Sequence, residues 1–385
     1  MSATAASAAT YMYVGNAGTN EIIVFSLNPK NGELTEMEKL TVPGITKAGG
    51  SMPMAVSPNK KFLYVGFRGE PQVAAAFAID GKSGKLKHLG NGKLADSMPY
   101  IHTDRSGKFL LAASYPGHKV TVNPIGADGV VQEPKQILAT PPNAHAILTD
   151  KSNRHVLVPS LGGDVVNQFK FDPASGTLSA NEPAGTKTGE KAGPRHFRFS
   201  SNEKFVYLLN ELDATIYVFD YDAKKGTLGR RVQLVSAMPP GVQVKPWAAE
   251  LQLTPDGKYL YASERTSCTL SAYKVDGANG VLTPVATIST EEQPRAFAID
   301  PTSKFLYVVG EKSDNMTAYA IDAKTGKLEK LKQYGMGKTR FGSRSSACHE
   351  FHVRNGVHGN AAPQNYVWSI TIVNGRKLRH LPHLT

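Results

Sequence analysis

The sequence repeats one strand-like pattern seven times, and this repeat constrains the fold more than any other feature. It occurs as YMYV, KFLYV, KFLLA, RHVLV, KFVYL, KYLYA and KFLYV. The aligned positions are separated by 51, 47, 46, 50, 54 and 46 residues, and they are Tyr11, Phe62, Phe109, His155, Phe205, Tyr259 and Phe305. Repeats of this length with four short strands each are typical of β-propellers, whose blades surround a central channel.

Each repeat has the same internal order. An alternating strand is followed by a turn rich in Asn, Asp, Ser and Lys, then by a strand such as KFLYV. A third strand such as ATIYVFDYD, a hairpin of the type x-x-G-x-L and a fourth strand complete the unit. The apolar residues have a period of two, unlike the 3.6 of a helix. The sequence therefore predicts an all-β fold, a seven-bladed β-propeller of four-stranded antiparallel blades.

The propeller is expected to form a single domain in residues 1–338, followed by an atypical C-terminal tail in residues 339–385. The first unit lacks the strand that precedes the others, because the chain begins almost at YMYV. A C-terminal segment must supply this strand to close the ring and remove exposed sheet edges. The candidate is YVWSITIVN, from Tyr366 to Asn374. The alternative is that the tail is disordered.

The formal net charge of +12 suggests nucleic acid or an anionic ligand as partner. The tail from Thr339 onward holds six basic residues against Glu350, and most other lysines lie in turns such as SPNKKF and DAKKGTL. We therefore expect no nucleic-acid partner. The first residues, MSATAASAATYMYVGNAG, lack the regions of a signal peptide, and no window approaches the ~20 apolar residues of a membrane span. A cytoplasmic protein without a membrane partner is expected.

The repeat also predicts which residues reach the mouth of the channel. In each blade the start of the first strand and the end of the second lie on the same face. Ten residues before the aligned position, this register gives His145, Arg195, Ala249 and Arg295. Blades two and three, with adjusted turns, offer Met54 and Tyr100. Six residues after it, the register gives Ala17, Arg68, Tyr115, Leu161, Glu211, Arg265 and Glu311.

Ionisable groups gathered in the middle of a domain are costly to desolvate unless they pair or bind something, so we predict a polar pocket. Arginines suit a phosphate or a carboxylate, and a His near a Glu could activate water. The alternative is a ring of salt bridges that only fills the channel. For His196, strand alternation predicts a side chain directed away from Arg195, where packing or hydrogen bonding between blades competes with a functional role. No nucleophile-elbow, P-loop or dinucleotide motif is present.

The stretches GPRHFRFSSNEKFVYLLNEL, WAAELQLTPDGKYLYASERT, EEQPRAFAID and HAILTDKSNRHVLVPSL resemble the seven-bladed propeller lactonase family, most closely its cycloisomerase-2-type 6-phosphogluconolactonase branch. The resemblance runs from about Tyr11 to Lys338. It implies hydrolysis of 6-phospho-D-glucono-1,5-lactone, a step of the oxidative pentose phosphate pathway, without a metal. It also implies a catalytic set of a His, two Arg and a Glu, which in this sequence are His145, Arg195, Glu211 and Arg265.

From the register and the resemblance together we expect a hydrolase that binds a small anionic sugar-phosphate lactone. Arginines would hold the phosphate and polarise the lactone carbonyl, while Glu211 or His145 activates water. The further substrate-binding candidates are Arg295, His196, Arg68, Tyr100 and Glu311. The alternatives are a carboxymuconate-lactonising cycloisomerase and a non-enzymatic propeller that binds proteins.

We expect no cofactor and no metal, because CHEFH in the tail lacks a second group of ligands. A monomer or a weak homo-oligomer is expected.

Overall fold

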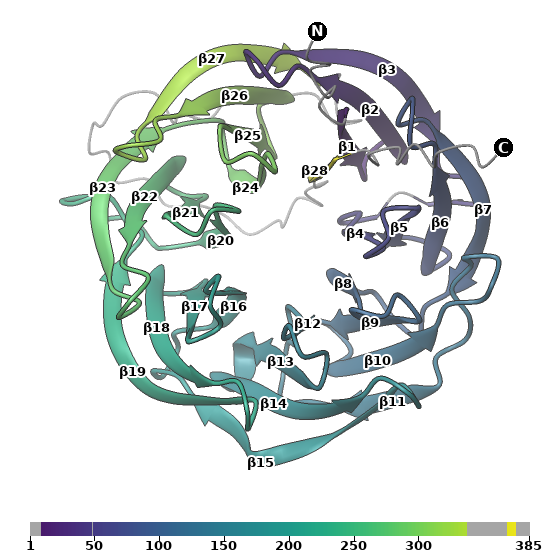
Figure 1. Cartoon of the computed structure of the whole chain (residues 1–385), viewed down its shortest axis with the longest axis horizontal. Helices are drawn as coiled ribbons and strands as arrows, with labels where there is room; N and C mark the ends of the chain where they lie inside the picture. The colour runs from purple at the N-terminus through teal and green to yellow at the C-terminus, as the bar shows by residue number, and fades with distance from the viewer. Residues whose placement is uncertain (1–8, 48, 337–367, 375–385) are drawn as a thin grey trace, which may run out of the picture.

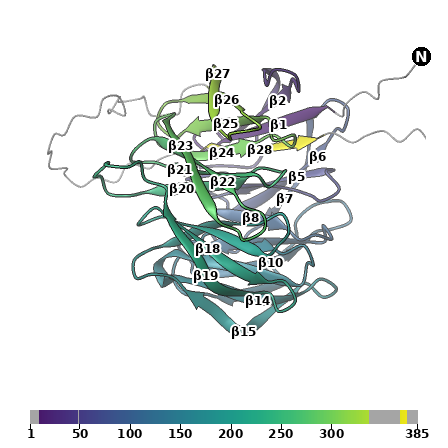
Figure 2. The same ribbon diagram turned by 60° about the vertical axis from the view of Figure 1, so that its left-hand side comes forward.

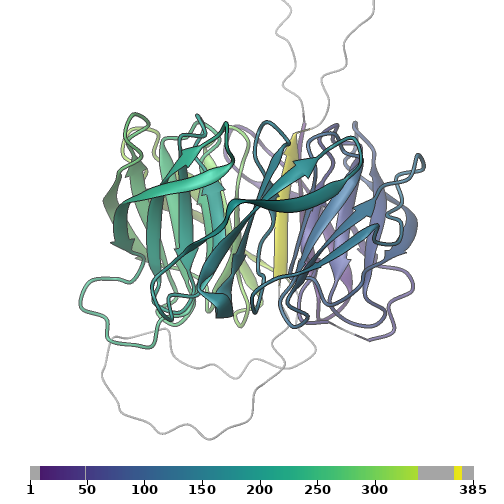
Figure 3. The same ribbon diagram turned by 90° about the horizontal axis from the view of Figure 1, so that it is seen from below.

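The computed structural model describes residues 9–47, 49–336 and 368–374. Within these residues the strands form seven four-stranded antiparallel sheets, arranged around a central channel (Figure 1). This confirms the predicted seven-bladed propeller. Figure 3 shows the strands running between the two faces of the ring, and in the oblique view of Figure 2 outer strands such as β15 and β19 lie at its rim.

The strands of the first four blades, innermost strand first, are β28 (Trp368–Asn374), β1 (Thr10–Asn16), β2 (Glu21–Leu27) and β3 (Leu34–Thr41); β4 (Met54–Val56), β5 (Phe62–Phe67), β6 (Val73–Ile79) and β7 (Leu86–Lys93); β8 (Tyr100–Thr103), β9 (Phe109–Ser114), β10 (Lys119–Pro124) and β11 (Gln136–Ala139); β12 (Leu148–Thr149), β13 (His155–Ser160), β14 (Val165–Asp172) and β15 (Thr177–Lys187). A short 3-10 helix, η1 (Leu161–Gly163), follows β13.

The strands of blades five to seven, in the same order, are β16 (Pro194–Phe199), β17 (Phe205–Asn210), β18 (Thr215–Asp222) and β19 (Thr227–Ser236); β20 (Ala248–Leu253), β21 (Tyr259–Glu264), β22 (Thr269–Val275) and β23 (Leu282–Ser289); β24 (Pro294–Ile299), β25 (Phe305–Gly310), β26 (Asn315–Ile321) and β27 (Leu328–Gly335). No helix among the described residues is long and apolar enough to cross a membrane.

Blade one is completed from the C-terminal part of the chain. Strand β28 pairs with β1 along its whole length, from Thr10 opposite Asn374 to Asn16 opposite Trp368 (Figure 1). Val373 is buried in the same apolar cluster as Tyr11. Residues 368–374 of the segment proposed from the sequence thus occupy the innermost position of the first blade, and β1 has a partner on both edges.

Neighbouring blades pack together through contacts between an aromatic or imidazole ring of one blade and a glycine of the next. The aligned ring of each repeat packs on the positive-φ glycine of the next blade's outer hairpin, and a Cβ added to that glycine would lie 2.1–2.6 Å from the ring. The pairs are Tyr11 on Gly84, Phe62 on Gly129, Phe109 on Gly176, His155 on Gly226, Phe205 on Gly280, Tyr259 on Gly326 and Phe305 on Gly32. The repeated x-x-G-x-L motif therefore serves the contact between blades as well as the turn.

The innermost strands of blades five to seven each contain a β-bulge near the mouth. In β16, Pro194 pairs with Asn210 and His196 with Leu209, which leaves Arg195 as the extra residue. In β24, Arg295 is the extra residue in the same way, and β20 has its irregularity between Ala248 and Leu251. Because a bulge breaks the alternation of side chains, it changes which residues face the channel.

Candidate active site

The strands bring the four residues of the predicted catalytic set to the channel mouth. Arg195 lies on the bulge of β16, while Glu211 and Arg265 directly follow β17 and β21. His145 precedes β12, beside the bridge between Ala144 and Ser160. All four belong to blades four to six, so adjacent innermost hairpins build one cluster.

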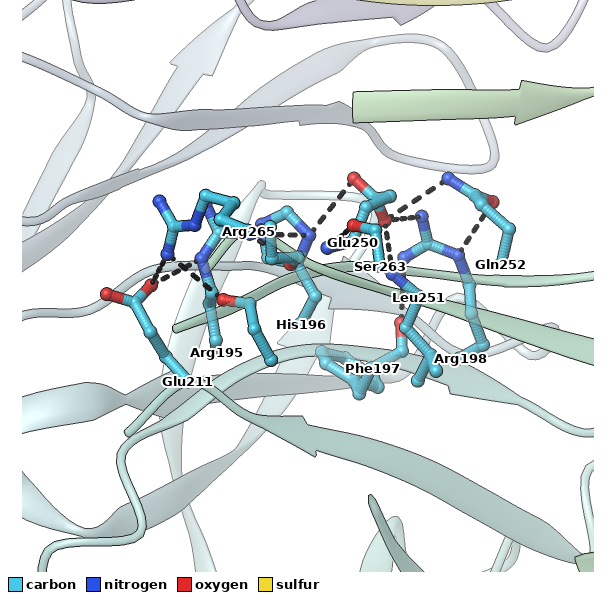
Figure 4. A network of polar contacts seen from close by, with 12 residues as sticks. Arg195, His196, Phe197, Arg198, Glu211, Glu250, Leu251, Gln252, Ser263 and Arg265 are labelled. Atoms are coloured by element: carbon cyan, nitrogen blue, oxygen red, sulfur yellow. Dashed lines mark hydrogen bonds and ion pairs between the residues drawn. The ribbon is translucent and has the colours of Figure 1, made fainter. Parts of the chain in front are cut away.

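Glu211 is held between two arginines (Figure 4). Its Oε2 accepts a hydrogen bond from Arg195 Nε at 2.6 Å and lies 3.1 Å from Arg265 Nη2. Both guanidinium groups are 2% exposed, so these ion pairs are almost fully desolvated. Burial raises the pKa of Glu211, but the charges of Arg265 and Arg195 outweigh it and leave the pKa lowered. Glu211 is therefore a carboxylate at neutral pH.

Trp247 completes this arrangement, and nothing in the repeat register pointed to it. Its Nε1 donates a hydrogen bond to Glu211 Oε1 at 3.2 Å. The Arg265 guanidinium lies 3.8 Å from the Trp247 ring centroid, and its Nε donates to the Trp247 carbonyl at 3.0 Å. Both oxygens of Glu211 are thus engaged, and Arg265 is fixed by a cation–π contact as well as by its ion pair.

A second polar cluster continues down the channel from Arg195 (Figure 4). His196 Nδ1 lies 3.2 Å from Glu250 Oε2, and Arg198 Nη2 lies 3.1 Å from Glu250 Oε1. Burial raises the pKa of Glu250, but His196 and then Arg198 lower it overall to about 2. Glu250 is therefore ionised and pairs with both side chains.

The expectation that His196 points away from Arg195 is wrong. Arg195 Nη1 lies 3.4 Å from His196 Nδ1 and 3.3 Å from its Nε2, and both residues line the same cavity. The bulge at Arg195 is the reason, because it breaks the alternation on which the expectation rested.

Glu250, Arg198 and Gln252 were not among the predicted residues. Register counting selected Ala249, but the irregularity of β20 brings its neighbour Glu250 into the cavity. A usable signal was present in the sequence, since His196 and Arg198, like Glu250 and Gln252, are polar residues two positions apart on innermost strands.

The cavity in the channel has a volume of about 240 Å³. His145 and Arg295 line it near the mouth, Tyr100 and Ile101 come from blade three, and β28 contributes three residues. The ring centroids of His145 and His196 are 5.1 Å apart, and that of Tyr100 is 5.3 Å from His196. Four predicted residues besides Arg195 therefore meet at this cavity, namely His145, His196, Tyr100 and Arg295.

Positive charge exceeds negative charge around the cavity. Arg295 is half-buried and forms no hydrogen bond or ion pair with the side chains the structure describes. Arg68 lies outside the cavity lining, and among the described residues its guanidinium donates to the hydroxyls of Ser97 and Ser51, at 3.0 and 3.3 Å. Burial, followed by the charges of Arg295 and Arg195, lowers the pKa of Arg68 to about 10, so it stays cationic at neutral pH. These two guanidinium groups lack a carboxylate partner among the described residues.

Glu311 lies outside the cavity wall. It is 5% exposed, and neither carboxylate oxygen has a hydrogen-bond partner in the part of the chain that the structure describes. Its backbone N–H donates to the Gln293 carbonyl at 3.0 Å, and its charge raises the pKa of Arg265. Glu311 therefore contributes to the potential of the site from a position behind its lining.

The described residues contain no group of three or more His, Cys, Asp or Glu side chains that could hold a metal ion. The CHEFH motif lies outside the described residues. The donors that face the cavity are mainly guanidinium and imidazole groups, which suit an anion rather than a cation.

Comparison with known proteins agrees with this fold. Residues 39–340 match the family model described as "Lactonase, 7-bladed beta-propeller". The chain is 39% identical over 327 residues to the 6-phosphogluconolactonase of Pectobacterium carotovorum subsp. carotovorum, covering 85% of this chain and 96% of the relative. It is 38% identical over 329 residues to the 6-phosphogluconolactonase of Photorhabdus laumondii, with the same coverage of each chain.

A solved structure, the periplasmic gluconolactonase of Pseudomonas aeruginosa, is similar with a TM-score of 0.77 and 26% identity, covering 86% of this chain and 97% of that protein. The fold is thus that of a propeller lactonase. The chain belongs to the seven-bladed β-propeller lactonase family. Its cytoplasmic location stays a prediction, since this similar structure is of a periplasmic protein.

Proposed function

We propose that this protein hydrolyses 6-phospho-D-glucono-1,5-lactone to 6-phospho-D-gluconate. The observation that carries the proposal is the excess of arginine over carboxylate around one cavity, which Arg195, Arg198 and Arg295 line together with Glu250. Arg295, and Arg68 outside the cavity lining, have no carboxylate partner among the described residues. A phosphate dianion supplies the missing negative charge. Relatives that share 36–39% of their sequence with this chain are named 6-phosphogluconolactonase, which supports the same substrate.

Arg295 binds the phosphate in this proposal, with Arg68 behind it. Guanidinium groups bind phosphate oxygens bidentately, and the interaction is stronger where the surroundings exclude water. Arg295 lines the cavity from the bulge in β24, and its positive charge lowers the pKa of Arg68 in addition to the larger effect of burial. Binding of a dianion relieves the repulsion between these like charges, which favours the phosphorylated substrate.

Arg195 polarises the lactone carbonyl and stabilises the oxyanion that forms when water adds to it. Its Nε is held by Glu211, and Nη1 also donates to the Ala249 carbonyl, so its position is fixed before substrate binds. Arg265 and Trp247 hold Glu211 in turn. Because both of its oxygens are engaged, Glu211 is better suited to orienting the arginines than to accepting a proton.

His145 lies at the cavity wall between two rings, with its centroid 5.7 Å from Tyr115 and 5.1 Å from His196. Its Nδ1 is buried and has no hydrogen-bond partner among the residues described. Burial, followed by Arg195, lowers the pKa of His145 well below its usual value, so the imidazole is neutral. In the proposal, His145 is a neutral member of the catalytic set that shapes the site beside the reacting carbonyl.

The test is a comparison of two substrates with purified protein. Freshly made 6-phosphogluconolactone should be hydrolysed faster than it reacts spontaneously, whereas a carboxymuconate should not be lactonised. Arg195→Ala and Glu211→Ala proteins that stay folded should lose the activity. Lactonisation of the muconate without hydrolysis of the lactone would identify the protein as a cycloisomerase, and inactivity on both would favour a binding function.

A further inference from the structure

We propose that His196 accepts the proton of the attacking water and that Glu250 positions its imidazole for this task. The inference rests on the proposed lactonase function and adds to it a second imidazole with a defined role. His196 faces the cavity, and Glu250 is the carboxylate in contact with its ring. Figure 4 shows the pair next to Arg195, which the proposed function assigns to the lactone carbonyl.

The hydrogen bonds of Glu250 determine the tautomer of His196. Glu250 Oε1 accepts from Arg198 Nη2 at 3.1 Å, from the Leu251 N–H at 2.9 Å and from Gln252 Nε2 at 3.3 Å. Oε2 lies 3.2 Å from His196 Nδ1. A carboxylate can only accept, so Nδ1 carries the proton and Nε2 keeps a lone pair.

Arg195 does not block that lone pair. Its Nη1 is almost equally far from the two ring nitrogens, at 3.4 and 3.3 Å. If Nη1 lay in the plane of the imidazole at these two distances, it would collide with Cε1, which sits between the two nitrogens. Nη1 therefore lies over the face of the ring. Nη1 also donates to the Ala249 carbonyl. The in-plane direction of Nε2 is therefore uncommitted.

Burial keeps His196 neutral in the free protein, and charged and titratable groups from four segments surround it. They come from β16 (Arg195 and Arg198), from β20 (Glu250), from β8 (Tyr100) and from the segment before β12 (His145). Burial lowers the pKa of His196 to about 4, since the two arginines partly cancel the opposite effect of Glu250. A bound phosphate dianion counteracts the arginines and makes the imidazole more basic.

The other two candidates for the base are less well placed. Glu211 uses both carboxylate oxygens to hold Arg195, Arg265 and Trp247. Among the described residues His145 has no carboxylate partner that would orient its ring, and its buried Nδ1 has no hydrogen-bond partner there either. Of the two described imidazoles that line the cavity, His196 is the one with a carboxylate at one nitrogen, and Arg195 approaches its second nitrogen from the ring face and not along the lone pair.

The step balances without a further reactant. The water oxygen bonds to the lactone carbonyl carbon while its proton passes to His196 Nε2, which gives an imidazolium and an oxyanion beside Arg195. The bond between that carbon and the ring oxygen then breaks. The ring oxygen takes the proton from the imidazolium and becomes a hydroxyl, and the new carboxylic acid releases a proton to solvent.

The test uses the full-length variants His196→Asn, Glu250→Gln and Glu250→Asp, with His102→Asn as control. Asn keeps a donor for Glu250 but cannot accept the proton. His102 is another imidazole on an innermost strand, bonded to Thr149 and absent from the cavity wall. We would measure kcat, KM, the pH profile of kcat/KM, thermal stability and the affinity for inorganic phosphate.

His196→Asn should lower kcat by roughly 10²- to 10⁴-fold, the range of general-base contributions, with little change in KM or in phosphate affinity. Glu250→Gln should lower kcat and move the acid limb of the profile to lower pH, because loss of the carboxylate lowers the basicity of His196. Glu250→Asp should restore part of kcat, and His102→Asn should behave as wild type.

A folded His196→Asn protein with kcat within about twofold of wild type would overturn the proposal and leave the lactonase function standing. So would Glu250 variants that change thermal stability while the pH profile stays the same. If Glu250→Gln does not fold, the kcat values and pH profiles of His196→Asn and Glu250→Asp decide whether the proposal holds. A wild-type protein without lactonase activity would instead contradict the proposed function, and with it the role assigned to His196.

Discussion

Arg295 offers the sharpest test of substrate recognition, because it forms no hydrogen bond or ion pair with the described side chains that its loss would break. Replacement by Gln removes the charge and keeps a polar side chain of similar reach. A hydrogen bond to a charged group contributes about 1.5–3 kcal/mol, and about 1.4 kcal/mol corresponds to a factor of ten. Arg295→Gln should therefore lower kcat/KM for 6-phosphogluconolactone roughly 10- to 100-fold.

The same substitution should change kcat/KM for unphosphorylated glucono-1,5-lactone by no more than about threefold, since that substrate lacks the group that Arg295 binds. Initial rates of acid release from both lactones, corrected for spontaneous hydrolysis, give the ratio of the two losses. Arg230→Gln is the matched control, because Arg230 is largely exposed on β19 and pairs only with Asp220 at 3.7 Å among the described residues. Equal losses on the two lactones would show that Arg295 does not recognise the phosphate.

Three further predictions concern stability. Gly84→Ala should lower the free energy of unfolding by about 2–4 kcal/mol, because a Cβ would lie 2.3 Å from the Tyr11 ring at a φ of +70°; Gly81→Ala, which meets nothing within 4 Å, should be near neutral in the same denaturant titration. Truncation after Lys338 removes β28 and leaves β1 with an open edge, so the melting temperature should fall; an unchanged value would contradict closure of the ring by this strand. The folded-state pKa of Glu211 is lowered, so its stabilisation is present above the ordinary glutamate pKa of 4.5 and is lost as the pH falls through the lower folded value. The stability difference between wild type and Glu211→Gln should accordingly shrink below pH 4.5, and a difference that grows on acidification would refute the ion-pair assignment.

The sequence predicted the architecture well because a propeller is a repeat with a fixed register. Each aligned ring faces a hairpin glycine of the next blade, so both partners of that contact are visible as spaced motifs. The same register places Arg195 and Glu211 at the two ends of one hairpin, and their side chains do meet. Position along a strand was therefore enough to find the mouth of the channel.

Register counting failed where the strands depart from regular pairing. A bulge puts Arg195 and His196 into the same cavity. The irregularity of β20 brings Glu250 to the cavity wall, where register counting predicted Ala249. Trp247 lies just before β20, where no periodicity applies. A bulge depends on the pairing between strands, which the spacing of one strand's residues does not reveal.

The central claim is that the arginine-rich channel hydrolyses a phosphorylated sugar lactone. The most direct measurement is the rate of 6-phosphogluconate formation from freshly made 6-phosphogluconolactone, with the spontaneous rate subtracted and Arg195→Ala as the comparison. Wild type should show saturable hydrolysis that inorganic phosphate inhibits competitively, and the folded variant should have lost it. A wild-type rate equal to the spontaneous rate, or an equally active Arg195→Ala protein, would contradict it.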